Sequence, residues 1–356
     1  MKLLKELLIS VAIVAVFFLL VGIVLPSHRH LSETIDTNRR PTLVYDTVNS
    51  FGRWKDWNSV TAHDPRAQLK ISGPASGVGA QIDYTGGNGV GKGSWKITGG
   101  QSNQSVDFAI NNDDMGSNKK ATISIKPDKS EKNTTLIQTY DVDYGFNLLG
   151  RYAGLYASSY AGEDMKINLR RLTGLLAEVP NLAYDQMTPP LTNTKFVELA
   201  ASDVITINSG TVINDFAHVY DSVKNNYQWL KRVMDANGLE PAGPFYLVTE
   251  DVNIANYGYN LVQPVKKKGS TATTGLTNVA LQGTVKFATI PARKAVMTSV
   301  SATDYNAMSL TRDALRAWAL VHGYQIADKS FEVYKDGVDK SFTAGAASFD
   351  VYWPVK

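Results

Sequence analysis

Three tyrosines, Tyr152, Tyr156 and Tyr160, stand four residues apart in a segment whose apolar spacing predicts a helix. At that spacing the phenol rings share one helix face, so their hydroxyls could orient a small molecule in a cavity. The alternative is that they are core aromatic residues whose hydroxyls reach toward water. Because an amphipathic pattern alone does not separate a pocket from a core, all three are candidate ligand-binding residues.

A glycine-rich segment, Gly86–Ser94, comes close to the spacing of a phosphate-binding loop. Gly93 stands where that loop needs a hydroxyl for magnesium, and the residues that follow, SWKIT, are typical of a strand. Phosphate binding requires the amino terminus of a helix at that point. We therefore predict a glycine-rich β-hairpin turn and no phosphate site.

Other catalytic and metal-binding patterns are missing from the sequence. It contains no cysteine, its five histidines have no metal-ligand spacing, and it has no G-x-S-x-G motif. We expect no catalytic residue, no metal site and no cofactor. His28, His30 and His63 are interpreted as surface residues.

The composition is that of a globular protein. Of 356 residues, 44% are hydrophobic and 19% are charged, with a net charge of +3. This length predicts two domains. The mild positive charge lacks the dense basic stripe of a nucleic-acid-binding protein, so we expect no nucleic-acid partner.

An uncharged apolar run, Leu7–Leu25, precedes the globular part. As a helix it would span about 28 Å, close to the hydrocarbon core of a bilayer. It is longer than the apolar region of a signal peptide and no A-x-A cleavage pattern follows it. We predict an uncleaved single-pass anchor within residues 1–28. Lys and Arg nearly balance across it, and we favour a bacterial cell membrane protein with an extracytoplasmic soluble part.

The first soluble domain is expected at residues 29–182. A strand at 30–37 and short helices near Pro41 and at 51–57 come first, and a long helix of about Leu149–Glu178 comes last. Between them, strand-like runs separated by Gly, Asn and Asp span Ala67–Ser72, Ala80–Tyr84, Gly93–Thr98, Ser105–Ile110, Lys120–Lys126 and Thr134–Val142. This order predicts a helix-grip fold, in which a curved sheet wraps the last helix and leaves a cavity.

Several segments of this domain resemble the START-like superfamily, in its polyketide cyclase/dehydrase-like branch. They are TLVYDTVNSFGRWKDWN with Trp54 and Trp57, the hairpin with Gly77 and Gly79, and the closing NLLGRYAGLYASSYAGEDMKINLRRL. The resemblance covers nearly the whole domain. It implies the helix-grip fold and leaves the activity open, because that fold hosts lipid carriers, cyclases and sensors.

A proline-rich linker, residues 183–194, leads to a second domain at 195–356. Two of its segments align: Tyr220 matches Tyr305, Gly238 matches Gly323, and the dipeptide Pro264-Val265 matches Pro354-Val355. This pattern predicts an internal duplication, with βαββ repeats at about 195–268 and 283–356 that pair about a pseudo-twofold axis. The predicted fold class of the whole chain is α+β.

The duplicated pattern resembles the GyrI-like domain, the effector-binding module of multidrug-responsive transcription regulators. In that family an acidic residue on the last strand meets cationic ligands, and Asp350 in FDVYWPVK holds the aligned position. The family more often has Glu, whose side chain reaches further. Tyr257, Tyr259, Tyr352 and Trp353 are near enough in sequence to supply aromatic rings for a cation. The alternative is an exposed Asp at a strand end beside core aromatic residues.

Together these features predict a membrane-tethered protein that binds or senses small hydrophobic or amphipathic molecules, including cations, without catalysis. The first alternative is an enzyme of the cyclase or hydrolase type that uses the START-like cavity, which would need an acid/base pair inside it. The second is a regulatory protein coupled to a transcriptional or envelope response. The predicted partners are the small ligand and the bilayer, through residues 7–25; no protein partner is indicated.

Overall fold

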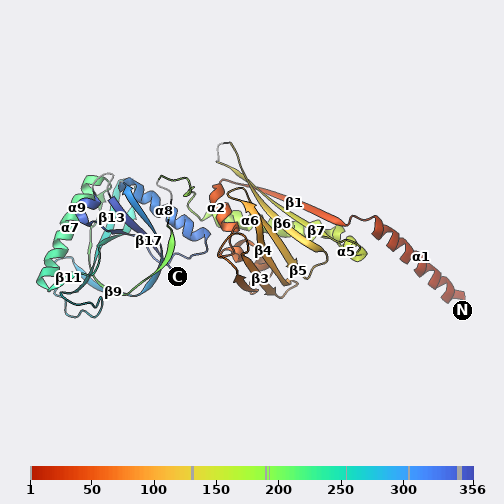
Figure 1. Ribbon diagram of the computed structural model, residues 1–356, viewed down its shortest axis with the longest axis horizontal. Helices are drawn as coiled ribbons and strands as arrows, with labels where there is room; N and C mark the ends of the chain where they lie inside the picture. The colour runs from red at the N-terminus through yellow and green to blue at the C-terminus, as the bar shows by residue number, and fades with distance from the viewer. Residues whose placement is uncertain are drawn as a thin grey trace. The chain divides into compact units, whose positions relative to one another are not determined.

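The computed structural model describes residues 2–129, 132–188, 191, 193–253, 255–303, 305–342 and 347–356. Part of the expected linker, residues 189, 190 and 192, lies outside these ranges. The chain forms two compact units, Met1–Asn181 and Leu182–Lys356. Each is a mixed α+β structure with a curled antiparallel sheet (Figure 1), which confirms the predicted fold class.

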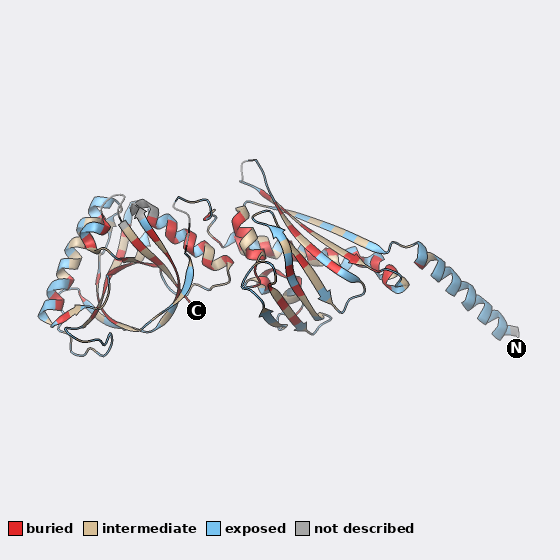
Figure 2. Cartoon of the chain, in the orientation of Figure 1, coloured by how far each residue is buried: buried red, intermediate tan, exposed pale blue. Residues whose placement is uncertain are grey.

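The predicted apolar helix is present as α1, Lys2–Val24. Its large apolar side chains are mostly exposed, and Phe17 is 68% exposed (Figure 2). Among the described residues it is the one helix long and apolar enough to cross a membrane, at Leu3–Val24. A signal sequence would share this length and composition.

The first unit contains a seven-stranded antiparallel sheet in the order β1-β7-β6-β5-β4-β3-β2. The strands are β1 His28–Thr37, β2 Gln68–Ser72, β3 Gln81–Gly86, β4 Gly91–Gln101, β5 Ser105–Asn112, β6 Ser117–Pro127 and β7 Thr134–Asp143. Each strand that the sequence predicts for this domain overlaps one of these seven strands. The glycine-rich segment is the tight turn between β3 and β4, where Asn88 and Gly89 both have positive φ. It is therefore a hairpin, as predicted.

The helices of this unit are α2 Pro41–Val48, α3 Trp54–Trp57, α4 Ser59–His63, α5 Leu148–Ala153 and α6 Glu163–Ala177. The expected single helix of about Leu149–Glu178 is thus interrupted. A 3₁₀ turn, Gly154–Tyr156, and a π-helical turn, Ser158–Gly162, separate α5 from α6. Gly154 fits against the ring of Tyr144, which would lie 2.7 Å from an added Cβ atom. Close packing of this ring on glycine, a weak helix former, accompanies the break.

The core of the first unit is aromatic. Trp54 and Trp57 are fully buried, and both rings contact Trp95 of β4. Trp95 in turn packs edge-on against Phe108 of β5, with ring centroids 5.3 Å apart. These contacts tie α3 to the sheet beneath α6 and provide the rigid base on which the cavity described below is built.

The second unit has a ten-stranded sheet whose main order is β14-β9-β13-β12-β16-β17-β15-β8, with β10 and β11 paired to β13. The strands are β8 Lys195–Leu199, β9 Ser202–Asn208, β10 Val212–Ile213, β11 Leu239–Pro241, β12 Tyr246–Val252, β13 Asn256–Lys267, β14 Lys286–Ile290, β15 Arg293–Thr303, β16 Phe331–Tyr334 and β17 Ala347–Val355. Its helices are α7 Phe216–Ala236, α8 Tyr305–Val321 and α9 Gly337–Ser341.

The two halves of the second unit share an order of elements. The first half has β9, α7, β12 and β13 in this order, with the short strands β10 and β11 on either side of α7. The second half has β15, α8, β16 and β17 in this order, with the short helix α9 before β17. Gly238 and Gly323 both have positive φ, at 62° and 91°, just after α7 and α8. A glycine is favoured at such a helix end because it adopts the left-handed conformation without a steric cost. The internal duplication itself stays a prediction.

Candidate functional site

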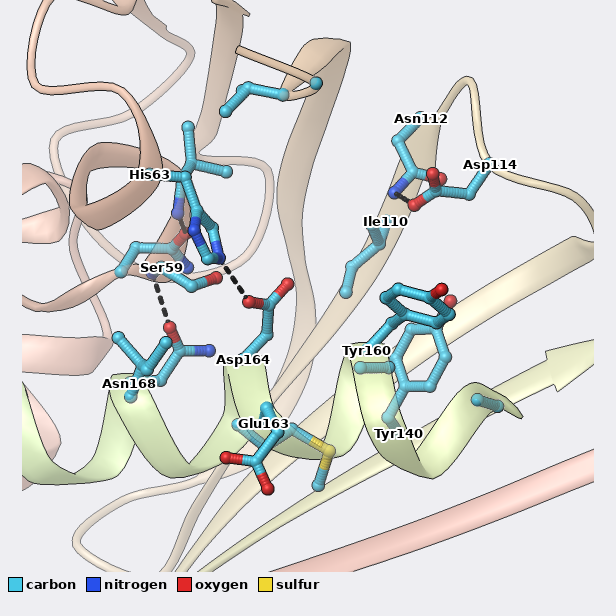
Figure 3. A pocket seen from close by; sticks show the side chains of 18 of the residues that line it. Ser59, His63, Ile110, Asn112, Asp114, Tyr140, Tyr160, Glu163, Asp164 and Asn168 are labelled. Atoms are coloured by element: carbon cyan, nitrogen blue, oxygen red, sulfur yellow. Dashed lines mark hydrogen bonds and ion pairs between the residues drawn. The ribbon is translucent and has the colours of Figure 1, made fainter. Parts of the chain in front are cut away.

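A cavity of about 760 Å³ lies in the first unit, between the sheet and the interrupted closing helix (Figure 3). Its volume is within the range of about 300–1,000 Å³ that is usual for small-molecule sites. α4, strands β3, β4, β5 and β7, and the stretch from α5 to α6 all contribute side chains to its lining. It is therefore the leading candidate site.

The helical wall of the cavity is the interrupted part of the closing helix. Tyr156 and Tyr160 both line the cavity and are 62% and 74% exposed, so they lie at its mouth. The π-helical turn places one extra residue in the helix, a feature that recurs at functional sites. Two of the three predicted tyrosines are thus beside the cavity.

Tyr152 lies elsewhere, on α5, where it packs against the apolar helix α1. Its ring stacks on that of Phe18, with centroids 4.1 Å apart, and its hydroxyl donates to the Phe18 carbonyl oxygen at 2.7 Å. The neighbouring Arg151 is buried and donates to the carbonyl oxygens of Gly22, Ile23 and Leu25 at 3.3, 2.7 and 3.2 Å. Tyr152 therefore joins α5 to α1 and does not line the cavity.

The sheet contributes phenol groups that the sequence did not single out. Burial raises the pKa of Tyr84 to about 12 and also raises the pKa values of Tyr140 and Tyr144. All three residues line the cavity. Their hydroxyls are protonated near neutral pH, so they offer hydrogen-bond donors among apolar neighbours such as Trp95 and Ile110.

Buried amides form a second polar group in the lining. Asn168 accepts a hydrogen bond from the Ser59 amide at 2.6 Å and donates to Gln138 Oε1 at 3.4 Å. Asn58 caps α4 by accepting from the Val60 amide at 3.0 Å. Its own Nδ2 atom is buried and has no protein partner. A ligand with an oxygen or nitrogen acceptor would satisfy that donor.

A histidine and a carboxylate meet at the cavity. His63 Nε2 lies 2.6 Å from Asp164 Oδ1, and both residues line the cavity while their side chains are 48% and 42% exposed (Figure 3). A carboxylate at this distance fixes the orientation of the imidazole ring. His63 was expected to be a surface residue; its partner was hidden because Asp164 is 101 positions away.

The charge of the lining is acidic. Asp114, Glu163 and Asp164 contribute carboxyl groups, and the described lining residues include no Lys or Arg. Glu163 is paired with Lys166 at 2.8 Å on the adjoining surface. A net negative lining favours a neutral or cationic molecule over an anion.

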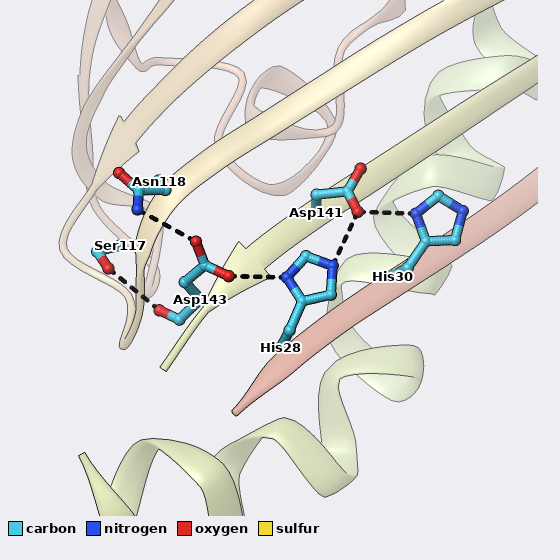
Figure 4. A network of polar contacts seen from close by, with 6 residues as sticks. All are labelled: His28, His30, Ser117, Asn118, Asp141 and Asp143. Carbon is cyan, nitrogen blue, oxygen red and sulfur yellow. Dashed lines mark hydrogen bonds and ion pairs between the residues drawn. The ribbon is translucent and has the colours of Figure 1, made fainter. Parts of the chain in front are cut away.

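A metal site finds no support in the described part of the chain, where no group of three or more His, Asp or Glu side chains is arranged to hold an ion. A network of histidine and aspartate side chains lies at the start of β1 (Figure 4). His28 contacts Asp143 at 2.7 Å and Asp141 at 3.2 Å, and His30 contacts Asp141 at 2.8 Å. These are exposed ion pairs between β1 and β7.

Asp350, the candidate for cation recognition, is held by protein groups. Its carboxylate accepts hydrogen bonds from Ser299 Oγ at 2.6 Å and from Lys335 Nζ at 2.7 Å, and the side chain is 16% exposed. Lys335 already supplies the positive charge that a ligand would bring. Asp350 lines neither of the two cavities described here.

The aromatic candidates of the second unit lie in three different places. Tyr257 and Tyr259 are buried in the core beside α7, 1% and 0% exposed. Tyr352 stacks on Phe331, with centroids 4.8 Å apart, in a different cluster. Trp353 donates to the Arg312 carbonyl oxygen and lines a second cavity. The structure does not bring these rings together around Asp350.

The second cavity has a volume of about 520 Å³ and lies in the second unit, beside α8. Arg312, which lines it, donates to Glu332 Oε1 at 2.6 Å. Glu332 is fully buried on β16, and its other oxygen, Oε2, has no partner. No pattern in the sequence marks this pair, because only tertiary packing shows which of many charged residues is buried.

Comparisons with known proteins identify no family for this chain. No family model matches the sequence, and no curated protein matches it. Among solved structures, it is similar to the C-terminal domain of EcmrR, with 20% identity, a TM-score of 0.37 and coverage of 46% of this chain and 97% of that one. It is also similar to norcoclaurine synthase from Thalictrum flavum (12% identity, TM-score 0.35, coverage 42% and 94%). A START superfamily protein from Mycobacterium smegmatis shows 16% identity, a TM-score of 0.32 and coverage of 42% and 97%.

Proposed function

We propose that this protein is a membrane-anchored binding protein whose first unit holds a small amphipathic molecule, neutral or cationic, without transforming it. The observation that carries this proposal is the cavity of about 760 Å³, whose lining contains aromatic side chains together with Asn58 and its unpaired amide donor. This donor would have no role in a cavity that stays empty, whereas a ligand with a polar head group would accept a hydrogen bond from it.

The chemistry of the ligand follows from the lining. Trp95, Ile110 and Met165 offer an apolar surface for a hydrocarbon or aromatic body. The tyrosine hydroxyls and Asn58 offer donors for an acceptor group. The acidic mouth disfavours a carboxylate or phosphate and suits an amine.

The anchor proposal rests on the contacts of Arg151. A signal sequence is removed from the mature protein, so tertiary contacts to it would be lost. Removal of α1 here would leave Arg151 without the three carbonyl groups of Gly22, Ile23 and Leu25 that it now meets. Loss of these partners would take three hydrogen bonds of a charged side chain from the folded unit. The contacts therefore favour an uncleaved anchor. We propose further that it lies in a bacterial cell membrane, with the two units outside the cytoplasm.

We also propose a fold type for each of the two domains. Residues 29–182 form a START-like helix-grip domain, and residues 195–356 form a GyrI-like domain made of two repeats about a pseudo-twofold axis. The shared order of elements in the two halves supports the repeats. This second domain acts as a further binding or sensing module, with the cavity beside Arg312 and Trp353 as its site.

Native mass spectrometry of the full chain extracted in mild detergent tests the binding proposal. The protein is expected to carry an additional mass of a small molecule. Ile110→Trp fills the cavity, so this variant should lack the additional mass. Ile71→Trp, on β2 where Ile71 is 52% exposed, should retain the additional mass. An unliganded wild-type protein, or equal retention by the two variants, would contradict the proposal.

A second candidate function, acid–base catalysis in the same cavity, is favoured by the 2.6 Å contact between His63 and Asp164. Incubation of the protein with its co-purified ligand would reveal conversion by mass. His63→Gln and Asp164→Asn should then abolish it. His218→Gln is the matched control, because His218 contacts Asp215 at the same 2.6 Å but does not line the cavity. No conversion by the wild-type protein supports the non-catalytic function.

A further inference from the structure

The carboxyl end of α1 is fixed to α5 and does not hang free. Arg151 donates to Gly22, Ile23 and Leu25 and also to the Gly145 carbonyl oxygen at 2.6 and 2.8 Å. The Tyr152 hydroxyl bonds to the Phe18 carbonyl oxygen at 2.7 Å. An added Cβ atom on Gly22 would lie 3.2 Å from the side chains of Leu148 and Tyr152, so the two helices pack closely. The position of α1 in a bilayer therefore determines the position of α5.

The depth of these contacts along α1 places α5 at the membrane boundary. Phe18 lies six residues before the end of the helix at Val24, which corresponds to about 9 Å along the axis. A helix that lies in the interface inserts its apolar face to a depth of about 5–10 Å. If α1 spans the bilayer, α5 must lie at that depth.

The side chains around α5 have the composition that this location requires. Phe146, Leu149 and Leu155 are 95%, 61% and 48% exposed, and Tyr156 and Tyr160 are 62% and 74% exposed. We call these five residues the apolar rim. Exposure of such a group to water is unfavourable, and tyrosine is enriched at membrane interfaces. Arg151 in this stretch is buried, and the next charged residues are Glu163 and Asp164, where the chain would return to water.

We propose that the apolar rim is inserted in the surface of the same bilayer that α1 spans, and that the cavity opens onto this surface. Tyr156 and Tyr160 belong both to the rim and to the cavity mouth. An amphipathic ligand would therefore pass from the membrane into the cavity without crossing water. This inference rests on the proposed anchor and adds the route of ligand entry.

The absence of cysteine from the sequence makes a site-specific test direct. Single cysteines at Leu149→Cys, Phe17→Cys and Val78→Cys are labelled with an environment-sensitive fluorophore in the full chain, reconstituted in phosphatidylcholine vesicles. Some vesicles carry a nitroxide quencher on the lipid acyl chains. Val78 is the matched control, because it is 68% exposed but follows β2, at the opposite edge of the sheet from β1.

Quenching of the labels at Leu149 and Phe17, without quenching at Val78, is the expected result. Quenching at Phe17 alone would overturn the insertion of the rim while the anchor stands. No quenching at either position would overturn the anchor and the rim together. The failures of the two proposals are therefore distinguishable.

Ligand entry is tested by Leu149→Glu, with Val78→Glu as its control. The probe is a fluorescent long-chain amine, delivered either from phosphatidylcholine vesicles or from aqueous solution below its micelle concentration. Leu149 does not line the cavity. Leu149→Glu should slow uptake from vesicles by about tenfold, because a charge replaces an inserted apolar side chain, and leave equilibrium binding from solution within about twofold. An unchanged uptake rate, or an equal loss of both, would overturn entry from the membrane.

Discussion

The guanidinium of Arg151 donates to the carbonyl oxygen of Ile23 at 2.7 Å, at the carboxyl end of the apolar helix. The last carbonyl groups of a helix have no partner within it, and a cation there also interacts favourably with the helix dipole. Arg151 supplies the missing hydrogen-bond donor and the positive charge, although it lies 128 positions from Ile23 in the sequence. One residue thereby couples the predicted anchor to the wall of the cavity.

Replacement of Arg151 by Met should weaken this coupling. The change removes charge-assisted hydrogen bonds to buried carbonyl groups and should lower the free energy of unfolding of the first unit by about 1.5–3 kcal/mol. Thermal unfolding of the full chain in detergent measures it. Arg170→Met, on the exposed side of α6, is the control and should change little. Equal effects of the two substitutions would show that the junction contributes no stability.

The buried pair of Arg312 and Glu332 predicts a double-mutant cycle. Removal of one partner leaves an unpaired buried charge, so Arg312→Met or Glu332→Gln should each cost the second unit about 3–5 kcal/mol. Replacement of both by Met should recover much of this loss, because no buried charge then remains. Urea unfolding measures each variant. Lys340→Met, which breaks an exposed pair with Asp336, is expected to cost under about 1 kcal/mol. Additive losses in the double variant would contradict direct coupling.

Gly93 should be intolerant of a side chain. An added Cβ atom would lie 2.4 Å from the Tyr84 hydroxyl and 2.5 Å from the Asn111 carbonyl oxygen. Gly93→Ala should displace Tyr84 from the cavity lining, reduce ligand retention in native mass spectrometry and destabilise the unit by about 1–3 kcal/mol. Gly174→Ala is the opposite case, since nothing lies near that position in α6. It should stabilise the helix by up to about 1 kcal/mol. Normal retention by Gly93→Ala would show that Tyr84 is not needed for binding.

The ion pairs at the start of β1 predict a pH dependence. The hydrogen bond with Asp143 raises the pKa of His28 above its ordinary value of 6.5. The contribution of this contact to stability is therefore fully present below about pH 6.5 and is lost as the pH rises through the raised pKa. Unfolding of the wild type between pH 5.5 and 8.5 should show this decline, and His28→Gln should reduce it. A histidine titration by NMR with a pKa at or below 6.5 would contradict the contact.

The strands and the apolar helix were predictable because their signals are local. Alternation of polar and apolar residues, with glycine and asparagine between runs, located the strands of the first unit, and the hairpin at Asn88 and Gly89 followed from the same pattern. The break in the closing helix was not predictable. Apolar spacing continues through Ser158–Gly162, where the structure has a π-helical turn, and the close fit of Gly154 against Tyr144 is a tertiary contact that no local pattern indicates.

The apolar helix at the amino terminus and the antiparallel strands and amphipathic helices after it could be predicted from the sequence, because hydrophobic periodicity is a property of neighbouring residues. Tertiary structure alone decided which polar groups meet. It paired Asp350 with Lys335, Glu332 with Arg312 and His63 with Asp164. The energy of such a contact depends on distance and burial, and neither can be read from the spacing of two residues along the chain.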